Sequence, residues 1–350
     1  MLFHVPAIDI HSHFFPEHWP DLDQRFGGDP WPRLRHTGPG TATVMLGERE
    51  FRPITEACWN VERRLADLDS NNIEQQVISA TPLLFAYARP PEQALEVAKI
   101  FNDLALEMTA RGDGRLHAIA QVPLQDTDAA CAELSRAMKA GHLGVQIGNH
   151  VGLRNLDDEG IVTFLQHCAD EGAAVLVHPW DMMAADRTAD YMMGWTVGMP
   201  AETQLSIVAL ILSGALDRLP KSLRLCFAHG GGSFAFLLGR LENAFINRDI
   251  ARGKAANPPS HYLDRFSVDC AVFDPRALRL LVEVMGSGHI MLGTDYPFPL
   301  GEQRMGALLR DADFLSSEDR AAMLGGNARA FLGLPAASGD TTGVSIKAHI

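Results

Sequence analysis

Short apolar stretches rich in β-branched residues recur along the chain, and each is followed by turn residues and a longer amphipathic stretch. Eight of them are predicted to be β-strands: 7–10, 75–79, 118–122, 144–147, 174–177, 223–228, 266–269 and 290–293. Helices are predicted between them: 60–71, 91–111, 128–140, 157–171, 202–218, 233–246 and 275–285. Strands that alternate with helices are typical of parallel βαβ units, and eight units predict an α/β fold, a TIM-like (β/α)8 barrel. An open doubly wound sheet is the second possibility, but no Gly-x-Gly-x-x-Gly motif follows the first strand.

One segment interrupts this alternation. Residues 16–59 are rich in Trp, Pro, Gly and polar residues, with a possible hairpin over 43–51. We interpret this segment as an insertion after the first strand, where it would cover the catalytic mouth of a barrel. The small, polar stretch 336–350 is expected to be a flexible tail, which leaves a single barrel domain over 1–335.

The composition narrows the class of protein. The chain has 350 residues, 47% of them hydrophobic, which suits one large domain with a sizeable core. A formal net charge of −13 argues against a nucleic-acid-binding protein. The five cysteines are scattered and odd in number, and the first residues do not have the pattern of a signal peptide. From the sequence we expect no apolar run long enough to span a bilayer. We therefore expect a cytoplasmic protein.

Polar residues follow the predicted strands at their carboxyl ends. His11 and His13 follow the first strand, His178 the fifth, His229 the sixth and Asp295 the eighth. Residues i and i+2 of a strand point to the same side, so the first two imidazoles are expected to share a direction. Because the strand ends of a barrel converge on the active site, these five side chains are predicted to meet there.

Imidazole and carboxylate ligands suit zinc or another divalent transition metal that activates a bound water. Five candidates exceed what one tetrahedral site needs, so one histidine is expected to act as a base. Each residue alone has a simpler explanation: a lone histidine is more often hydrogen-bonded in a core or loop, and Asp295 could cap a helix. The joint pattern favours the metal site. None of the lysines (Lys99, Lys139, Lys221, Lys254 and Lys347) ends a predicted strand, which favours one metal over a lysine-bridged pair.

Three arginines are candidates for binding an anionic substrate. Arg52 lies in the insertion, and Arg240 and Arg248 follow the His-Gly-Gly-Gly string that begins at His229. Arginine is the natural bidentate partner of a carboxylate, although each of the three could instead form a surface ion pair. The aromatic residues that could form an apolar wall, or could be ordinary packing, are Trp180, Trp195 and Phe298.

Several strings together resemble a known superfamily. They are IDIHSHFFP, QVPLQD, GHLGVQIGNH, VLVHPWDMM, GMPAET, CFAHGGGSFAFLLGR and LGTDYPFPLGE. They resemble the metal-dependent amidohydrolase superfamily and, within it, the family of α-amino-β-carboxymuconate-ε-semialdehyde decarboxylases. The resemblance extends from about residue 8 to residue 334.

The resemblance implies roles for the candidate residues. It implies one zinc ion per subunit, although other divalent metals are possible, held by His11, His13, His178 and Asp295. It implies that His229 assists as acid and base, with Asp295 also part of the catalytic group. For the substrate, it implies binding by Arg52 and a nearby Trp195. Family members are homodimers in which an arginine crosses to the neighbouring subunit, and Arg240 and Arg248 both lie in the matching segment.

The implied reaction is a zinc-dependent, non-oxidative decarboxylation, so the chain would be a carboxy-lyase. Its small-molecule substrate would be 2-amino-3-carboxymuconate 6-semialdehyde, a dicarboxylate, and its products 2-aminomuconate 6-semialdehyde and CO2. The setting would be tryptophan (kynurenine) or nitroaromatic catabolism. Two alternatives stay open within the superfamily: decarboxylation of another aromatic acid, of the resorcylate type, and hydrolysis of a lactone. A non-catalytic barrel that acts as a binding or scaffold protein is a third.

Overall fold

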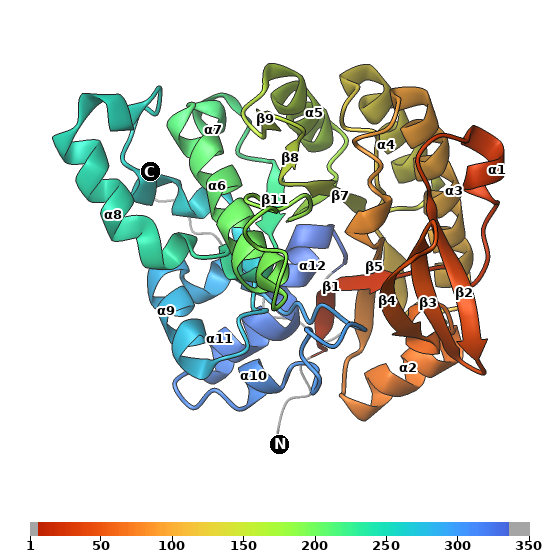
Figure 1. The fold of residues 1–350 in the computed structure, drawn as a ribbon. Coiled ribbons are helices and arrows are strands. Elements are labelled where there is room, and N and C mark those ends of the chain that lie inside the picture. Colours follow the sequence, from red (N-terminus) through yellow and green to blue (C-terminus); the bar gives the residue numbers. More distant parts are fainter. Residues whose placement is uncertain (1–5, 336–350) are drawn as a thin grey trace.

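Eight parallel strands form the centre of the molecule (Figure 1), and the computed structural model describes residues 6–335. The strands are β1 (Ile8–Phe14), β5 (Gln75–Ala80), β6 (Leu116–Ala118), β7 (Gly144–Gly148), β10 (Ala174–His178), β11 (Arg224–Phe227), β12 (Ser267–Asp269) and β13 (Ile290–Met291). Hydrogen bonding orders them as β1-β5-β6 and as β7-β10-β11-β12-β13. Two parallel bridges join these sheets: one pairs Ala120 with Val145, and the other pairs Ser12 with Tyr296. The strands therefore follow one another around a (β/α)8 barrel, as predicted.

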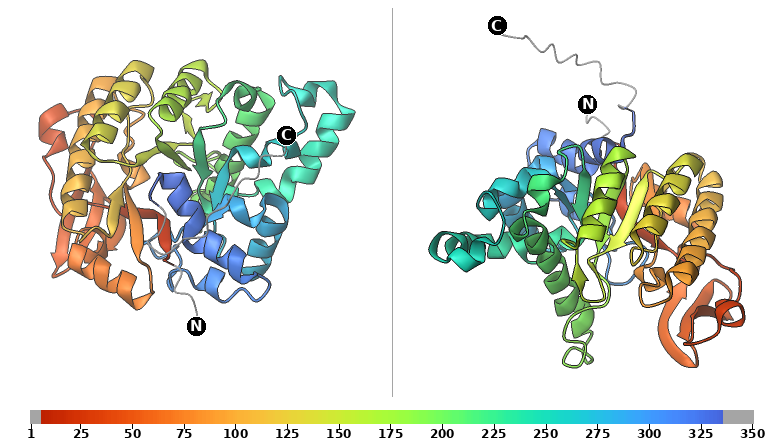
Figure 2. Two further views of the ribbon diagram at one scale, coloured as in Figure 1. Left: turned by 180° about the vertical axis from the view of Figure 1, so that it is seen from behind. Right: turned by 90° about the horizontal axis from the view of Figure 1, so that it is seen from above.

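The helices pack around these strands (Figure 2). They are α2 (Val61–Ser70), α3 (Pro91–Ala110), α4 (Thr127–Ala140), α5 (Glu159–Asp170), α6 (Met199–Leu212), α7 (Ala215–Arg218), α8 (Phe234–Asn247), α9 (Pro275–Met285), α10 (Ala307–Arg310), α11 (Ser317–Ala321) and α12 (Asn327–Leu332). Side-chain oxygens cap several of them; for example, Asp126 accepts from the backbone N–H of Ala129 at the start of α4. Strands such as β7 and β10 are buried along their whole length, which is why they consist of nearly continuous apolar runs.

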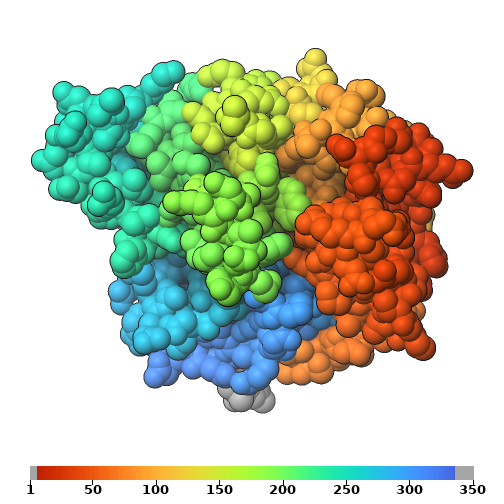
Figure 3. All heavy atoms as spheres, viewed as in Figure 1, coloured from red at the N-terminus to blue at the C-terminus, as the bar shows by residue number. Residues whose placement is uncertain are grey.

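The segment between β1 and α2 forms a separate layer at one side of the barrel (Figure 1). It contains α1 (Leu22–Phe26) and an antiparallel sheet of β2 (Pro32–Gly38), β3 (Thr41–Leu46) and β4 (Arg49–Thr55). The predicted hairpin over 43–51 is the β3–β4 part of this sheet, and β2 was not predicted. In the space-filling view (Figure 3), the green segment that follows β10 lies against this red-orange layer. A small hairpin, β8 (His150–Val151) and β9 (Arg154–Asn155), follows β7.

Some predicted boundaries are wrong. The first strand does not end at residue 10: β1 continues to Phe14, so its two histidines lie inside the strand. The third strand, predicted over 118–122, is β6 at Leu116–Ala118. The helix predicted over 202–218 is two helices, because Gly214 adopts a φ of 73° between α6 and α7. The tail predicted over 336–350 lies outside the described residues.

One helical run corrects an expectation from composition. By length and composition alone, Gly194–Leu212 is long and apolar enough to cross a membrane. It consists of a π-helical turn, Gly194–Gly198, followed by α6, and Ile207 and Leu210 on α6 are buried in the core. We therefore interpret it as a helix that packs on the barrel.

Candidate metal centre

Four side chains predicted as metal ligands meet at one end of the barrel. They are His11 and His13 from β1, His178 from the end of β10, and Asp295 after β13, and their donor atoms lie within 4.8 Å of one another. The Nε2 atoms of His11 and His13 are 3.2 Å apart. The Asp295 Oδ1 atom lies 3.3 Å from Nε2 of His13 and 3.7 Å from Nε2 of His11. Three imidazoles and one carboxylate around a common point form a donor set typical of a catalytic zinc or a similar metal.

The outer nitrogen of each imidazole has a partner that turns the other nitrogen inward. The Nδ1 atom of His11 lies 2.6 Å from the Asp269 carboxylate, and that of His178 lies 3.0 Å from the Pro179 carbonyl. The Nδ1 atom of His13 is 3.3 Å from the Ser79 hydroxyl. Such contacts fix the tautomer and orientation of metal-binding histidines.

The inward nitrogen of His178 gives a direct test of whether a metal fits. This Nε2 atom is buried and has no hydrogen-bond partner among residues 6–335. A buried polar atom without a partner carries a free-energy cost, so its presence calls for a ligand. The residues present therefore fit a divalent metal.

Strand β1 is shaped so that both of its histidines face the centre. Its pairing with β5 shifts register between Asp9 and Ser12. The buried Asp9 carboxylate accepts from the backbone N–H groups of His11 and Thr294, each at 3.1 Å. Burial raises the pKa of Asp9 to about 6. These contacts tie the two ligand-bearing segments, β1 and the residues after β13, to one another.

A buried arginine supports the same strand from outside the metal centre. Arg64 on α2 is fully buried, and its guanidinium donates to the carbonyls of His13 at 2.7 Å and Ala57 at 3.0 Å. It also donates to Gln76 and lies 4.8 Å from the centre of the Tyr296 ring. Arg64 was not identified from the sequence, because two of its partners are backbone carbonyls and the other two are side chains of β1 and β5 that no motif links to it.

The surroundings give the ligands different proton affinities. Burial acts to lower the pKa of His11, but the hydrogen bond and charge of Asp269 outweigh it and raise that pKa to about 8. Burial lowers the pKa of His13 to about 4 and holds that of His178 well below its usual value. Burial acts to raise the pKa of Asp295, but the adjacent imidazoles hold it well below its ordinary range. Neutral His13 and His178 beside an ionised Asp295 are in the protonation states that bind metals.

His229 lies beside the cluster rather than within it. Its Nε2 atom is 3.7 Å from Asp295, and its ring centre is 5.0 Å from that of His178. Its Nδ1 atom is buried and, in the described part of the chain, has no hydrogen-bond partner. The residue adopts a φ of 55°, in the left-handed region. An imidazole in this position can exchange a proton with a molecule bound at the cluster.

A cavity of about 440 Å³ opens over the cluster and reaches the insertion. His13, His178 and Asp295 lie at its base, and Arg52 from β4 lines its wall. The other lining residues are mostly apolar or aromatic and include Phe51, Trp180, Trp195, Met199 and Phe298.

The Arg52 side chain is the cation of this cavity. Its guanidinium carbon lies 4.5 Å from the centre of the Phe298 ring and 5.5 Å from that of Phe51. No carboxylate of residues 6–335 forms an ion pair with it. A guanidinium that is stacked and otherwise unpaired is well placed to bind a carboxylate of a ligand.

Two predicted substrate-binding residues are not brought to this cavity within one chain. Arg240 lies on α8 and Arg248 follows its last residue, and both are exposed. Arg240 lines a different surface cavity, beside Leu205 and Phe234. Exposed apolar side chains, Phe236, Ile246 and Ile250, lie on and just after the same helix.

Asp269 was missed although the sequence carries a signal for it. It is the last residue of β12, and it accepts from the backbone N–H of Gly230 at 3.0 Å as well as contacting His11. The position at a strand end, which identified the ligands, applies equally to Asp269. What the sequence does not show is that its carboxylate faces an imidazole rather than the metal.

The chain is similar to known proteins over nearly its whole length. A family model described as amidohydrolase matches residues 8–334. A 2-amino-3-carboxymuconate-6-semialdehyde decarboxylase from Dictyostelium discoideum is 40% identical over 331 residues, which cover 93% of this chain and 91% of the relative. A protein of the same name from Caenorhabditis elegans is 31% identical, with 92% of each chain covered.

Solved structures show the same fold. The apo structure of Metarhizium anisopliae IDCase aligns with a TM-score of 0.80 at 22% identity, covering 94% of this chain and 97% of that one. A dihydroxybenzoic acid decarboxylase from Polaromonas, solved with manganese and 2-nitroresorcinol, aligns with a TM-score of 0.74 at 19% identity, covering 94% and 97%.

Proposed function

Because the chain belongs to the amidohydrolase family and is a carboxy-lyase, we propose that it decarboxylates 2-amino-3-carboxymuconate 6-semialdehyde. The products would be 2-aminomuconate 6-semialdehyde and CO2, in tryptophan (kynurenine) or nitroaromatic catabolism and in the cytoplasm. The observation that carries this proposal is the Arg52 guanidinium, which forms no ion pair with residues 6–335 and lines the same cavity as three of the four ligand candidates. The Dictyostelium discoideum relative supports the choice of substrate by its name.

The metal would be held by His11, His13, His178 and Asp295. Amidohydrolase-family decarboxylases bind a divalent metal, and we propose zinc because three imidazoles and one carboxylate suit it. Bound there, the metal would supply Lewis acidity that polarises an oxygen of the substrate or of water. Metal analysis of the purified protein, with zinc and manganese added separately to metal-free enzyme, would test this choice.

The side chains around the cluster have separable tasks. Arg52 would bind a carboxylate of the substrate through two parallel hydrogen bonds and so fix its orientation. The aromatic walls would exclude water from the reacting carbon. When the C–C bond to the departing CO2 breaks, its electron pair stays on the substrate carbon, and His229 would deliver a proton to that carbon. Asp295, 3.7 Å away, would stabilise the charged form of this imidazole.

The assay that tests this proposal uses purified, zinc-loaded protein and freshly generated substrate. The near-UV absorbance of the substrate should decay, and CO2 should be released in equal amount. If protein with one zinc per chain leaves the substrate unchanged, the proposed substrate is wrong. An Arg52→Ala variant with full metal content should lose most of the activity.

The fold also supports a second candidate, decarboxylation of an aromatic acid or hydrolysis of a lactone. The aromatic wall formed by Phe51, Trp180 and Trp195 would suit a planar ring, and the Polaromonas structure is named as a decarboxylase of such an acid. A substrate panel in oxygen-18 water separates these activities, since a hydrolase incorporates solvent oxygen into its product and a decarboxylase does not.

We also propose that the active form is a homodimer in which α8 meets the partner subunit. The exposed Phe236, Ile246 and Ile250 would be buried there, and Arg240 or Arg248 would reach the partner's cavity. Light scattering after size-exclusion chromatography would measure the oligomeric state. Mixing an Arg52→Ala subunit with an Arg240→Ala or Arg248→Ala subunit should restore activity only for the arginine that crosses.

A further inference from the structure

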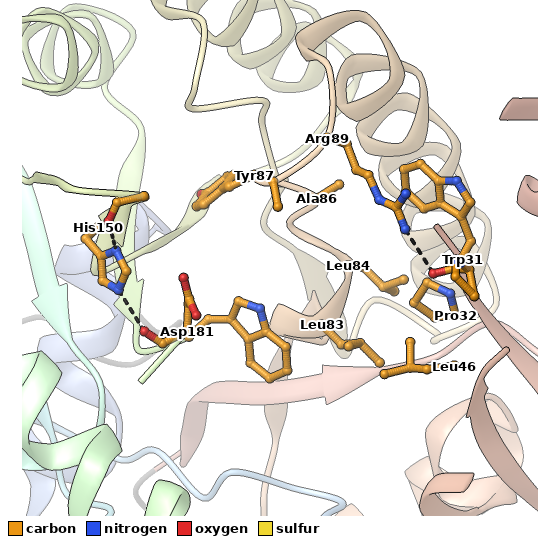
Figure 4. Close-up of a pocket in the computed structure, with 14 residues that line it drawn as sticks. Trp31, Pro32, Leu46, Leu83, Leu84, Ala86, Tyr87, Arg89, His150 and Asp181 are labelled. Atoms are coloured by element: carbon orange, nitrogen blue, oxygen red, sulfur yellow. Dashed lines mark hydrogen bonds between the residues drawn. The ribbon is translucent and has the colours of Figure 1, made fainter. Parts of the chain in front are cut away.

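A second cavity, of about 320 Å³, lies next to the cavity over the metal centre. Figure 4 shows His150 and Asp181 at one end of it and Trp31 and Arg89 at the other. Among residues 6–335, Trp180 alone lines both cavities. Trp180 therefore lies at the boundary between the cavity over the metal centre and a comparable cavity beside it.

Several polar groups that line the second cavity are bound to other parts of the chain. The Arg89 guanidinium donates to the Pro30 carbonyl at 2.9 Å, and the Tyr87 hydroxyl accepts from the Gly148 N–H at 3.1 Å. The ring nitrogens of His150 face two carbonyl oxygens, at 2.8 and 2.9 Å. The Trp31 indole N–H and the Asp181 carboxylate have no partner among residues 6–335. Because most of the other lining residues are apolar or aromatic, we interpret this cavity as mainly apolar space that a larger ligand could enter from the metal side.

Trp180 is held in place through the backbone on both sides of it. The backbone N–H of Trp180 donates to the side-chain oxygen of Asn149 at 2.8 Å. The side-chain amide of Asn149 in turn donates to the Glu202 carboxylate at 2.9 Å. The other Glu202 oxygen accepts from the backbone N–H of Met183 at 2.6 Å. Asn149 and Glu202 are buried, at 1% and 5% exposure, so these bonds are shielded from water. Asp181, directly after the tryptophan, adopts a φ of 61°, which turns the chain back at this point.

These contacts also suggest a role for residues other than the metal-ligand candidate His178 in three of the strings. Asn149 lies in GHLGVQIGNH, Trp180 and Met183 lie in VLVHPWDMM, and Glu202 lies in GMPAET. Asn149 follows β7, Trp180 and Met183 follow β10, and Glu202 lies in the first turn of α6. These residues come together only when the barrel has folded. Together they fix the backbone that carries the Trp180 indole, and the centre of the Phe51 ring lies 6.4 Å from the centre of that indole.

We propose that Trp180 is a specificity-determining residue that sets the upper size limit of the acid bound at the metal centre. The inference rests on the proposed function, because Arg52 and the metal would anchor that acid in the first cavity. A compact dicarboxylate fits in front of the indole, whereas an acid with a second ring collides with it. Removing the indole joins the two cavities and admits the second ring.

The test compares two acids that share the same anchoring groups: isophthalate and 5-phenylisophthalate. Their dissociation constants are measured by titration calorimetry with zinc-loaded wild type, Trp180→Ala and Trp180→Phe. Wild type should prefer isophthalate, and Trp180→Ala should shift the preference toward 5-phenylisophthalate by about tenfold or more. Trp180→Phe keeps a ring in place and should shift it less.

A matched control enlarges the second cavity without opening it. Leu83 lines that cavity and not the one over the metal, so Leu83→Ala should keep the wild-type preference. Glu202→Ala keeps the indole but removes its support, and it should shift the preference in the same direction as Trp180→Ala. If Trp180→Ala does not fold, the binding preference of Glu202→Ala tests the proposal in its place.

Two results would overturn the inference. One is a wild-type preference for isophthalate over 5-phenylisophthalate in the folded, zinc-loaded Trp180→Ala or Glu202→Ala variant. The other is that neither of these two variants binds either acid. Failure of the proposed function is distinguishable, because it appears in wild type as absent CO2 release from the muconate substrate while the binding preference still responds to Trp180.

Discussion

The metal end of the barrel and the segments that cover it are built in different ways. The ligand candidates His11, His13 and His178 lie on strands, and the outer nitrogen of each contacts a fixed neighbour. The residues proposed to face a substrate, Arg52 and Trp180, lie on the inserted sheet and on the segment after β10. The metal-ligand candidates are thus placed by the central strands, whereas the residues proposed to select the substrate lie on segments that connect those strands.

The largest effect is expected from a change at the metal end. His178→Ala removes a ligand whose Nε2 atom faces the centre, so metal content should fall close to zero and activity by about a thousandfold or more. Metal analysis and the CO2 assay measure both losses. His167→Ala is the control, because His167 lies on α5 and contacts Ser135. Full activity in metal-free His178→Ala would show that the cluster is not the reactive centre.

A smaller loss at the same end should follow from Asp269→Asn. In one orientation, the asparagine NH2 group would face the Nδ1–H of His11. In the other, it would face the backbone N–H of Gly230, so one hydrogen bond of the carboxylate is lost in either case. Metal affinity should therefore fall by about 10- to 100-fold. Competition with a chromophoric chelator measures the affinity. Asp311→Asn, at an exposed carboxylate beside Arg304, should leave it unchanged. Equal affinities for both variants would mean that Asp269 does not support the metal centre.

Arg52→Ala tests the covering layer and should separate substrate binding from metal binding. Loss of charge-assisted hydrogen bonds to a carboxylate should lower kcat/KM by about 10- to 100-fold, mainly through KM, with unchanged metal content. Arg52→Lys should recover part of the loss. Arg49→Ala, on the exposed side of the same strand, is the control. A loss of metal in Arg52→Ala would show that the two regions are not independent.

The smallest effect is expected in the turn of the inserted hairpin. Gly47 has a φ of 59°, and a Cβ atom there would lie 3.0 Å from Pro30. Gly47→Ala should therefore reduce the free energy of unfolding by about 1 kcal/mol, measured by urea titration. Glu48→Ala, at the adjacent exposed position, should change it by less than about 0.5 kcal/mol. The metal content of both variants should equal that of wild type.

The metal end could be predicted from the sequence because its signals are local. A β-branched apolar run indicates a strand, and the position of a histidine or aspartate at its carboxyl end indicates the direction of the side chain. The placement of His11, His13, His178 and Asp295 follows from these rules and from the order of strands in a barrel. The length of β1 does not, because His11, Ser12 and His13 interrupt the apolar run, and residues 12–14 stay in the strand through pairing with β5.

The covering layer was predicted only in outline. The position of Arg52 in an insertion suggested that it covers the mouth, but its stacking on Phe298 depends on a contact across the fold. The role of Trp180 depends on two cavities that no pattern in the sequence reveals. Arg64 and Asp269 act through partners far away in the chain, and such pairings are set by tertiary structure rather than by spacing.

The seam between the first and last strands of the barrel has a consequence for biosynthesis. His11 emerges from the ribosome early and Asp295 late, and the N–H of Ile10 bonds the carbonyl of Leu292 only when both ends of the barrel are present. A nascent chain lacks the fourth candidate ligand until the segment after β13 has been made. Tight metal binding is therefore expected only after this segment has emerged and closed the barrel.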